Sequence, residues 1–271
     1  MTDFVPLLIF GAGKMGGAML GGALRAGWPP RMITVIDPNP SDALRARAAA
    51  EGFALNPGQV SGAARLVLLA IKPQMLDSAA TTLVHHVSGD TVLVSVLAGK
   101  SIADLKARLP VLTKLVRAMP NTPAAIGRGI TGAYAAGNLT DAERALVLAL
   151  LKTTGRLEWV EAEALIDSVT AVSGSGPAYV FHLVETLAKA GEAVGLPPDL
   201  SMRLARATIE GAGELLFQEA ETSPATLRQN VTSPGGTTAA ALEVLMAADG
   251  LQPLMTRAVK AARARARALS G

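Results

Sequence analysis

Short, almost continuous runs of apolar residues alternate with longer segments of helical periodicity up to about residue 155. Apolar runs of this length are typical of strands buried on both faces, and the segments between them are long enough for crossover helices. We therefore expect parallel βαβ units with helices on both sides of the sheet. The strands are predicted at Val5–Phe10, Met32–Ile36, Leu66–Ile71, Thr91–Val96 and Leu115–Ala118.

The strand pattern stops at about Val160, and helical periodicity in Ala, Leu, Glu and Arg continues to the end of the chain. Thr140-Asp141-Ala142-Glu143 predicts a capping box at the start of a helix before this change. We expect an α/β domain of residues 1–160 and an all-α domain of residues 161–271. Pro and Gly predict breaks within the helical half at Ser173–Pro177, Gly195–Asp199, Ser223–Pro224 and Ser233–Gly236.

The amino-acid composition excludes several classes of protein and of catalytic site. Hydrophobic residues make up 50% of the chain and charged residues 17%, which excludes an intrinsically disordered protein. The absence of cysteine excludes disulfides, thiolate metal sites and thiol nucleophiles. The chain has only 3 histidines, His85, His86 and His182, so we expect no metal and no Ser-His-Asp triad. His182 lies beside Phe181 and Leu183, and we interpret it as a packing residue rather than a proton donor.

The distribution of charge and of apolar residues indicates whether the protein binds nucleic acid or a membrane. The net charge is +3, and much of the excess lies near the C-terminus. We interpret the basic residues near the C-terminus as the solvated face of the last helix, because cations are favourable at the C-terminal end of a helix dipole. Aromatic residues make up only 3% of the chain, which argues against a surface that stacks on nucleic-acid bases. No apolar run reaches the ~18 residues of a membrane helix. No basic region precedes the first apolar run, so we expect neither a membrane partner nor a signal peptide, and a cytoplasmic location. The cations are Arg257, Lys260, Arg263, Arg265 and Arg267.

A glycine-rich loop follows the first predicted strand. Gly11-Ala12-Gly13-Lys14-Met15-Gly16 is a G-x-G-x-x-G sequence between a strand and a helix. In this context Gly11 permits the tight turn, Gly13 lets the backbone approach a pyrophosphate, and Gly16 lets the helix pack against the strand. The pyrophosphate then lies at the positive end of the helix. The sequence predicts a doubly wound, Rossmann-type domain that binds a dinucleotide.

Asp37 ends the second predicted strand, about 20 residues after the glycines. An acid at this position can accept hydrogen bonds from a ribose 2′-hydroxyl, which favours NAD, and repels a 2′-phosphate. An ordinary turn in Asp37-Pro38-Asn39-Pro40 explains the residue equally well.

The loops after the later strands are expected to lie at the same edge of the sheet, where ligands bind in open α/β folds. Ala70-Ile71-Lys72-Pro73 can line the cofactor, and Lys72 can reach a phosphate or the substrate or be a solvated lysine. Leu97-Ala98-Gly99 follows the fourth strand. Prolines on either side of Asn121 and Thr122 predict a rigid loop with polar groups facing the crevice.

Two glycine-rich loops in the helical half combine hydroxyl groups with expected helix N-termini. Ser173–Pro177 precedes a predicted helix at Ala178–Leu187, and Val231–Thr238 precedes another at Ala239–Ala247. Free N–H groups and hydroxyls at such positions suit a small anion such as a carboxylate. For the second loop we favour substrate binding over simple helix capping.

Together these motifs resemble the pyrroline-5-carboxylate reductase family along nearly the whole chain. The resemblance implies NAD(P)H-dependent reduction of Δ1-pyrroline-5-carboxylate to L-proline, the last step of proline biosynthesis. It also implies a Rossmann domain and a helical domain that interlocks with a second subunit in a homodimer, often assembled into a decamer of five dimers. The segments that carry it are Phe10–Gly16, Leu68–Gln74, Arg117–Thr131, Val172–Leu183 and Leu227–Thr238.

The resemblance implies roles for individual residues. Thr237 and Thr238 match positions that hold the substrate, and Glu221 matches an acid near the same site. Asp37 departs from the pattern, because the family often prefers NADPH. The positions that match cofactor contacts are Gly11, Gly13, Lys14, Met15, Asn56, Ala70, Lys72, Ala98 and Asn230.

For such a reaction the cofactor supplies the hydride and the protein orients the imino acid. We expect the Thr238 hydroxyl to bond the ring nitrogen, and Ser233 with the N–H groups of Gly236–Thr238 to hold the carboxylate. A protonated imine needs no strong acid from the enzyme, in keeping with the few histidines. The alternative enzyme is a β-hydroxyacid dehydrogenase, which needs a general base and has Lys189 as its central candidate, or another imine reductase. A redox-sensing dinucleotide module is less favoured, since it needs no second anion site.

Overall fold

The computed structural model describes residues 4–58 and 62–270, and the chain divides into two compact units. The sheet unit extends to Ser175 and resumes at Ala262, and the helical unit is Gly176–Ala261. The domain boundary predicted at residue 160 lies before helix α6 (Leu165–Val169), which packs with the sheet unit. The last turns of the C-terminal helix also belong to the sheet unit by their contacts.

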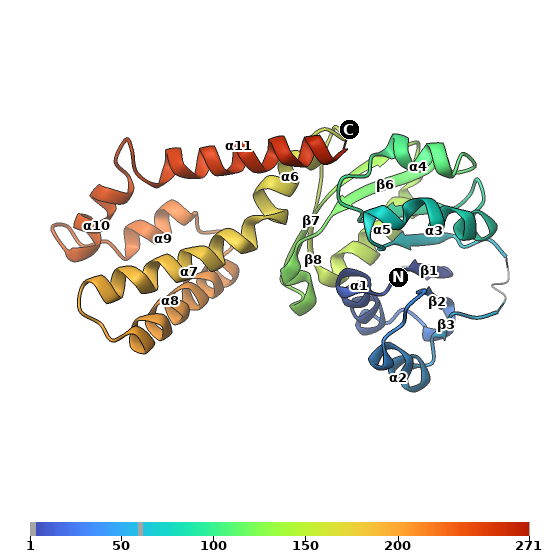
Figure 1. Cartoon of the computed structure of the whole chain (residues 1–271), viewed down its shortest axis with the longest axis horizontal. Helices are drawn as coiled ribbons and strands as arrows, with labels where there is room; N and C mark the ends of the chain where they lie inside the picture. The colour runs from blue at the N-terminus through green and yellow to red at the C-terminus, as the bar shows by residue number, and fades with distance from the viewer. Residues whose placement is uncertain (1–3, 59–61, 271) are drawn as a thin grey trace. The chain divides into compact units, whose positions relative to one another are not determined.

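The sheet unit is built on a single 8-stranded sheet with the order β3-β2-β1-β4-β5-β6-β7-β8 (Figure 1). All neighbouring strands are parallel except β6 and β7, which are antiparallel. The chain leaves β1 toward β2 on one side and returns to β4 on the other, so the strand order reverses at β1. The strands are β1 (Leu7–Phe10), β2 (Ile33–Ile36), β3 (Ala54–Leu55), β4 (Leu66–Leu69), β5 (Val92–Ser95), β6 (Lys114–Met119), β7 (Gly129–Ala136) and β8 (Gly155–Trp159).

Helices cover both faces of this sheet, as the expected doubly wound fold requires. Alternate residues of each strand point to opposite faces, so Leu7 and Ile9 join one hydrophobic core while Leu8 and Phe10 join the other. The first core is closed by α1 and α5, and the second by α3 and α4. The helices of the unit are α1 (Lys14–Arg25), α2 (Asp42–Glu51), α3 (Leu76–Leu83), α4 (Ile102–Arg108), α5 (Asp141–Leu151) and α6.

The five predicted strands are confirmed as β1, β2, β4, β5 and β6, each with ends that differ by a residue or two. The capping box at Thr140 is also confirmed, with both of its hydrogen bonds formed at the start of α5. Three strands were not predicted, namely β3, β7 and β8. Strand β7 is rich in Gly and Ala because α6 approaches it closely: a Cβ atom at Gly132 would lie 2.6 Å from the Val169 side chain.

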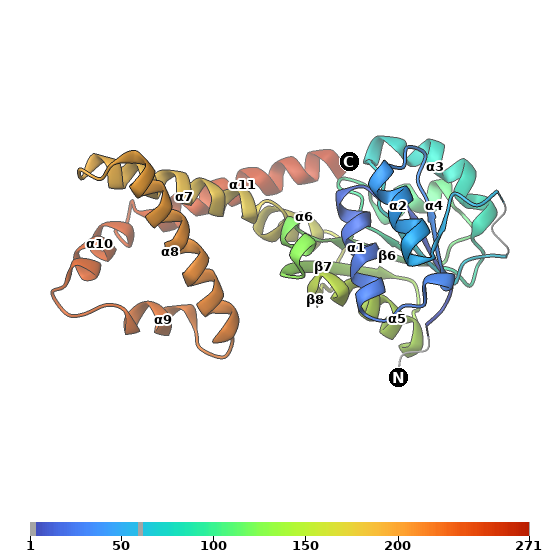
Figure 2. The same cartoon turned by 90° about the horizontal axis from the view of Figure 1, so that it is seen from below.

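The helical unit contains only helices, as predicted, and α7 and α8 form a packed pair in which α8 turns back and crosses α7 at a steep angle (Figure 2). This pair packs tightly, since the buried Ser201 hydroxyl donates to the Ala188 carbonyl and a Cβ at Gly191 would meet Ser201. The breaks predicted at Gly195–Asp199, Ser223–Pro224 and Ser233–Gly236 lie between these helices, and a further break between Leu245 and Leu251 was not predicted. The helices are α7 (Gly176–Ala193), α8 (Pro198–Gln218), α9 (Pro224–Asn230), α10 (Thr237–Leu245) and α11 (Leu251–Ser270), of which α11 ends in the sheet unit.

The turn predicted at Ser173–Pro177 is wrong. Residues Thr170–Gly174 form a π-helix after α6, and Ser175 keeps helical dihedral angles (φ −85°, ψ −18°). The Ser175 N–H donates to the Thr170 carbonyl at 2.8 Å, so it is not a free donor for an anion. The glycines of this segment therefore belong to an irregular helix, a form that occurs often at functional sites.

Among the described residues, no helix is both long and apolar enough to span a bilayer. The five cations predicted on the last helix are all exposed on α11.

Candidate dinucleotide and imino-acid sites

The predicted cofactor residues of the sheet unit gather at the carboxyl ends of its parallel strands. The glycine-rich loop joins β1 to α1, beside the point where the strand order reverses, which is where open α/β sheets bind ligands. Asp37 follows β2, Asn56 follows β3, Ala70 and Lys72 follow β4, and Ala98 follows β5. One edge of the sheet thus carries every cofactor residue predicted in this unit.

The glycines of this loop have the geometry that the fingerprint requires. Gly11 has φ +91°, and a Cβ atom there would lie 2.8 Å from the Ala70 carbonyl oxygen. A Cβ at Gly16 would lie 2.0 Å from the Gly11 carbonyl oxygen, so only glycine lets α1 approach β1. At Gly13 a Cβ would meet no protein atom within 4 Å. The space beside Gly13 is therefore open for a ligand, while the other two glycines are fixed by packing.

Helix α1 begins at this open space with unsatisfied donors. Gly13 is its N-cap, and no side chain of residues 4–58 or 62–270 caps the first turn. The first N–H groups of a helix have no partner within it, so those of Lys14, Met15 and Gly16 point toward the loop. A phosphate is the kind of group that such a helix end binds. A dinucleotide pyrophosphate fits this arrangement.

Asp37 is held firmly at the end of β2. Its carboxylate oxygens accept the N–H groups of Ala12 and Asn39 at 2.8 and 2.9 Å. The side chain of Asn56 bonds both the N–H and the carbonyl of Asp37, at 2.9 and 2.8 Å. Asn56 itself has φ +45°, which asparagine tolerates. Asp37 therefore shapes the turn and supports the glycine loop, and each of its carboxylate oxygens keeps a further lone pair for a hydroxyl.

The loops after β4 and β6 differ in whether their polar side chains are available to bind a ligand. Ala70 touches the glycine loop, while Lys72 is exposed. The polar groups expected to face the crevice after β6 do not all do so. The Asn121 amide donates to the Ser173 carbonyl at 3.2 Å and accepts the Ile130 N–H at 2.9 Å. Its side chain is used to join the loop to the π-helix and to β7.

In the helical unit, Ser233-Pro234-Gly235-Gly236 forms a tight turn before α10. The Gly236 N–H donates to the Ser233 carbonyl at 3.0 Å, and Gly235 has φ +68°, as the third residue of a type II turn requires. The Gly236 N–H expected among the carboxylate donors is thus taken up within the turn. Gly236 is the N-cap of α10 and no side chain bonds its first turn, so Thr237 and Thr238 begin the helix with free N–H groups.

The remaining predicted residues of the helical unit are accessible. Glu221 lies in the turn between α8 and α9, and Asn230 ends α9. Within the described residues, no hydrogen bond or ion pair joins either side chain to the turn before α10. His182 does not pack within the single chain as we expected, because its side chain is 73% exposed there and pairs with Glu185 at 3.1 Å.

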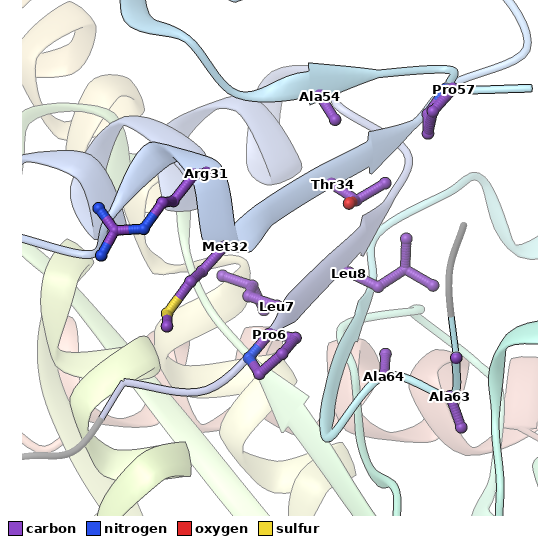
Figure 3. A pocket seen from close by; sticks show the side chains of 11 residues that line it. Pro6, Leu7, Leu8, Arg31, Met32, Thr34, Ala54, Pro57, Ala63 and Ala64 are labelled. Carbon is purple, nitrogen blue, oxygen red and sulfur yellow. The ribbon is translucent and has the colours of Figure 1, made fainter. Parts of the chain in front are cut away.

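A pocket of about 340 Å³ lies at the opposite edge of the sheet, near the amino ends of β1 and β2 (Figure 3). It is lined by small and apolar side chains such as Leu8 and Ala64, and the Arg31 guanidinium points away from Leu8 and Thr34. It contains none of the predicted cofactor residues, so it is separate from the glycine-rich loop. Among the described residues, no group of three His, Asp or Glu side chains has the arrangement of a metal site.

Comparison with known proteins identifies the family. The chain is 37% identical to a pyrroline-5-carboxylate reductase of Pseudomonas aeruginosa over 268 residues, which cover 97% of this chain and 96% of that protein. The chain belongs to the pyrroline-5-carboxylate reductase family. A family model described as pyrroline-5-carboxylate reductase dimerisation matches residues 163–269, and one described as NADP oxidoreductase, coenzyme F420-dependent, matches residues 7–99.

Solved structures of the pyrroline-5-carboxylate reductase family have the same fold. The structure from Coxiella burnetii is 31% identical, with a TM-score of 0.90, and covers 99% of this chain and 100% of that one. A pyrroline carboxylate reductase of Plasmodium falciparum with NADP bound is 25% identical, with a TM-score of 0.77 and full coverage of both chains. The resemblance that the sequence motifs carry is thus confirmed, and so is the predicted pairing of a Rossmann domain with a helical one.

Proposed function

We propose that this protein reduces Δ1-pyrroline-5-carboxylate to L-proline with a nicotinamide dinucleotide. The observation that carries the proposal is the pair of open helix N-termini, one after Gly13 and one after Gly236, each uncapped by a side chain. The first suits a pyrophosphate and the second a small carboxylate, which are the two anions that this reaction brings together. Family membership at 37% identity over nearly the whole chain supports the same activity.

In this proposal the glycine-rich loop and the strand ends hold the dinucleotide. When bound, it supplies the hydride that reduces the imine carbon C5. Gly11, Gly13, Lys14, Met15 and Gly16 cradle the pyrophosphate, and Asp37 and Asn56 lie on the ribose side. Ala70, Lys72 and Ala98 line the loops at the adjoining strand ends, and Asn230 is a further cofactor contact from the helical unit.

The turn before α10 holds the substrate carboxylate. The free N–H groups of Thr237 and Thr238, with the Ser233 hydroxyl, are the donors, and Gly236 shapes the turn. The Thr238 hydroxyl accepts the N–H of the protonated ring nitrogen, and Glu221 provides a nearby negative charge. The proton on nitrogen is present before reduction, so proline forms without a separate acid. His182, paired with Glu185 on the surface of this chain, is not needed in such a scheme.

Either NADH or NADPH is accepted in this proposal, with Asp37 favouring NADH. A carboxylate at the end of β2 can accept the ribose 2′-hydroxyl and repels a 2′-phosphate. The Plasmodium relative carries NADP, so cofactor choice is expected to vary within the family.

We further propose that the protein works in the cytoplasm as a homodimer, which can assemble into a decamer of five dimers. The helical unit supports self-association because Phe181 and other large apolar side chains are exposed in the single chain. The reaction and its partners involve no nucleic acid and no membrane.

The direct test is oxidation of NADH or NADPH, followed by absorbance, with Δ1-pyrroline-5-carboxylate as the other substrate and proline identified as the product. We expect turnover with at least one nucleotide. A protein that binds the nucleotide yet forms no proline with either one would contradict the proposal.

A further inference from the structure

Arg117 is a buried cation that the proposed reaction does not use. It lies in β6, in register with Ser95, the last residue of β5, and only 4% of it is exposed. Its guanidinium donates to Glu163 at 3.1 Å and to the Ser270 hydroxyl at 3.1 Å, and it lies 3.5 Å from the Asp167 carboxylate. A charge so deeply buried is held by several partners distant in the sequence.

These partners come from separate segments of the sheet unit. Glu163 precedes α6, Asp167 lies within α6, and Ser270 ends α11. The same Glu163 oxygen that pairs with Arg117 also accepts the N–H of Ile102, the first residue of α4, at 2.8 Å. One guanidinium therefore joins the start of α4, the helix α6 and the C-terminal turn of the chain. We call Arg117, Glu163, Asp167 and Ser270 the Arg117 cluster.

The Arg117 cluster adjoins the loop from β5 to α4, which contains Ala98. Gly99 in this loop has φ +69°, and a Cβ there would lie 2.8 Å from the carbonyl oxygen of Leu269. The last turn of α11 thus contacts the loop directly. On its other side the loop leads into Ile102, whose N–H bonds Glu163. The loop is consequently held at its middle by the residue next to Ser270 and at its α4 end by Glu163, and Arg117 bonds both Ser270 and Glu163.

Stability alone is a poor explanation of this arrangement. Buried ion pairs are often no more stabilising than apolar side chains of similar volume, because desolvation offsets their attraction. Within the described residues, the buried Nε of Arg117 also has no hydrogen-bond partner, which is unfavourable. Such groups can instead specify one geometry among several that packing allows.

We propose that Arg117 is a positioning residue, which holds the loop from β5 to α4 in the conformation that binds the nicotinamide dinucleotide. The inference rests on the proposed function to the extent that Ala98 lines the cofactor. In this view the C-terminal turn of the chain is a structural part of the cofactor site, although it is remote from the glycine-rich loop in the sequence.

The test uses the full-length protein and compares two ion pairs on the same strand. Arg117→Lys keeps the charge but loses the planar fork that reaches several partners. The control is Lys114→Met at the first residue of β6, which breaks the pair between Lys114 and Glu143 (2.7 Å). For each variant, NADH and NADPH are titrated by fluorescence, thermal unfolding is recorded, and hydrogen exchange of residues 96–101 is followed by mass spectrometry.

We expect Arg117→Lys to raise the Kd of both nucleotides about tenfold and to speed exchange in residues 96–101. Lys114→Met is expected to lower the unfolding temperature while leaving both Kd values within about twofold and the loop exchange unchanged. Should Arg117→Lys fail to fold, Asp167→Asn, which has the same shape, serves in its place with the same expected direction.

A Kd for Arg117→Lys within twofold of the original value would overturn the inference, as would equal changes in the two variants. The measurements separate this inference from the proposed function. A protein that binds nucleotides but does not reduce Δ1-pyrroline-5-carboxylate contradicts the function alone. A protein that reduces it, and whose Arg117→Lys variant binds nucleotides normally, contradicts only the positioning role.

Discussion

Two glycines three positions apart in the β1–α1 loop are glycine for different reasons. Gly16 is enclosed, since a Cβ there would lie 2.0 Å from the Gly11 carbonyl oxygen, whereas a Cβ at Gly13 would meet no protein atom within 4 Å. Packing of the protein accounts for the first. Packing makes no such demand at Gly13, as expected where the backbone is to be approached closely by a pyrophosphate.

We predict that Gly13→Val lowers dinucleotide affinity at least tenfold, about 1.4 kcal/mol, and leaves the unfolding temperature nearly unchanged. The branched side chain extends into the space where the pyrophosphate is proposed to approach, and its Cβ atom has no described protein atom within 4 Å. Gly16→Ala is the matched comparison and should destabilise the fold itself. Fluorescence titration with thermal unfolding distinguishes the two, and an unaltered affinity in Gly13→Val would refute the loop's role.

Asp37 carries the prediction about cofactor choice. If its carboxylate bonds the ribose 2′-hydroxyl, Asp37→Ser weakens NADH and improves NADPH, because the repulsion of a 2′-phosphate is removed. The carboxylate also accepts the Ala12 and Asn39 N–H groups, so part of any loss reflects the loop. The control is Asn56→Gly, which removes the clamp on the Asp37 backbone and should weaken both nucleotides alike. If the ratio of the two Kd values stays constant in Asp37→Ser, the residue serves the turn only.

Thr238 carries the prediction about the substrate. It lies in the first turn of α10, half-buried, and its proposed hydrogen bond is to a charged ring nitrogen. Loss of such a bond costs about 1.5–3 kcal/mol, so Thr238→Ala should lower kcat/KM by roughly 10- to 150-fold. Thr238→Ser keeps the hydroxyl and should retain most activity. A Thr238→Ala variant with normal kinetics and a lower unfolding temperature would make Thr238 only a helix residue.

Among the secondary-structure elements, the parts of the fold that follow from local pattern could be predicted. The apolar runs of β1, β4 and β5 face core on both sides, and the capping box of α5 is satisfied within four residues. Strand β7 lacks this pattern because the close approach of α6 and of neighbouring backbone replaces bulky residues by Gly and Ala. In β8 the exposed Arg156 and Glu158 alternate with Leu157 and Trp159, so no continuous apolar run marks the strand.

The placement of the glycine loop and of Asp37 at the carboxyl ends of β1 and β2 could be predicted for the same reason, since each directly follows a strand with a recognisable apolar run. The π-helix at Thr170–Gly174 could not, since Asn121 holds the Ser173 carbonyl from a loop 52 residues away. The Arg117 cluster joins residues 117 and 270, a separation of 153 that leaves no local signal.

The short helix Val84–His86 after α3 carries a prediction about pH. Burial, and to a smaller extent the charge of His85, lowers the pKa of His86 below its usual 6.5. The folded protein disfavours the protonated form of His86. The contribution of neutral His86 to the free energy of unfolding is therefore fully present above pH 6.5 and is lost as the pH falls through the lowered pKa. We predict that the unfolding temperature declines from pH 7 toward pH 5.

The variant His86→Gln, which cannot be protonated, should show a shallower decline over this range. The comparison variant is His182→Gln, which removes an exposed histidine of the helical unit. Carboxylates with lowered pKa values, such as Glu143 beside Lys114, act in a different window, below about pH 4.5. An identical slope in His86→Gln and the original protein would contradict the assignment.

For the whole molecule, the distribution of buried apolar residues separates the two units. Both hydrophobic cores consist of sheet-unit residues, whereas few residues of the helical unit, such as Ala188 and Ala205, are buried in one chain. Helices α7 and α8 instead line an apolar groove of about 490 Å³ that includes Phe181 and Met202. The apolar face of an amphipathic helix is normally covered by other apolar residues. Residues 163–269, which include α7 and α8, match the family model described as pyrroline-5-carboxylate reductase dimerisation.

We therefore predict a particle of at least twice the 27.7 kDa of one chain in light scattering at micromolar concentration. Phe181 is 65% exposed in the single chain, so Phe181→Asp should introduce a charge into the shared apolar surface and shift the protein toward the single-chain mass. Val84→Asp is the matched control, since Val84 is 43% exposed on the sheet unit and lies outside this surface. The two variants add the same charge to the chain, so a change of mass in Phe181→Asp alone assigns the association to the helical unit. An original protein that scatters as a single chain would contradict the prediction, because its α7–α8 groove would then remain open to water.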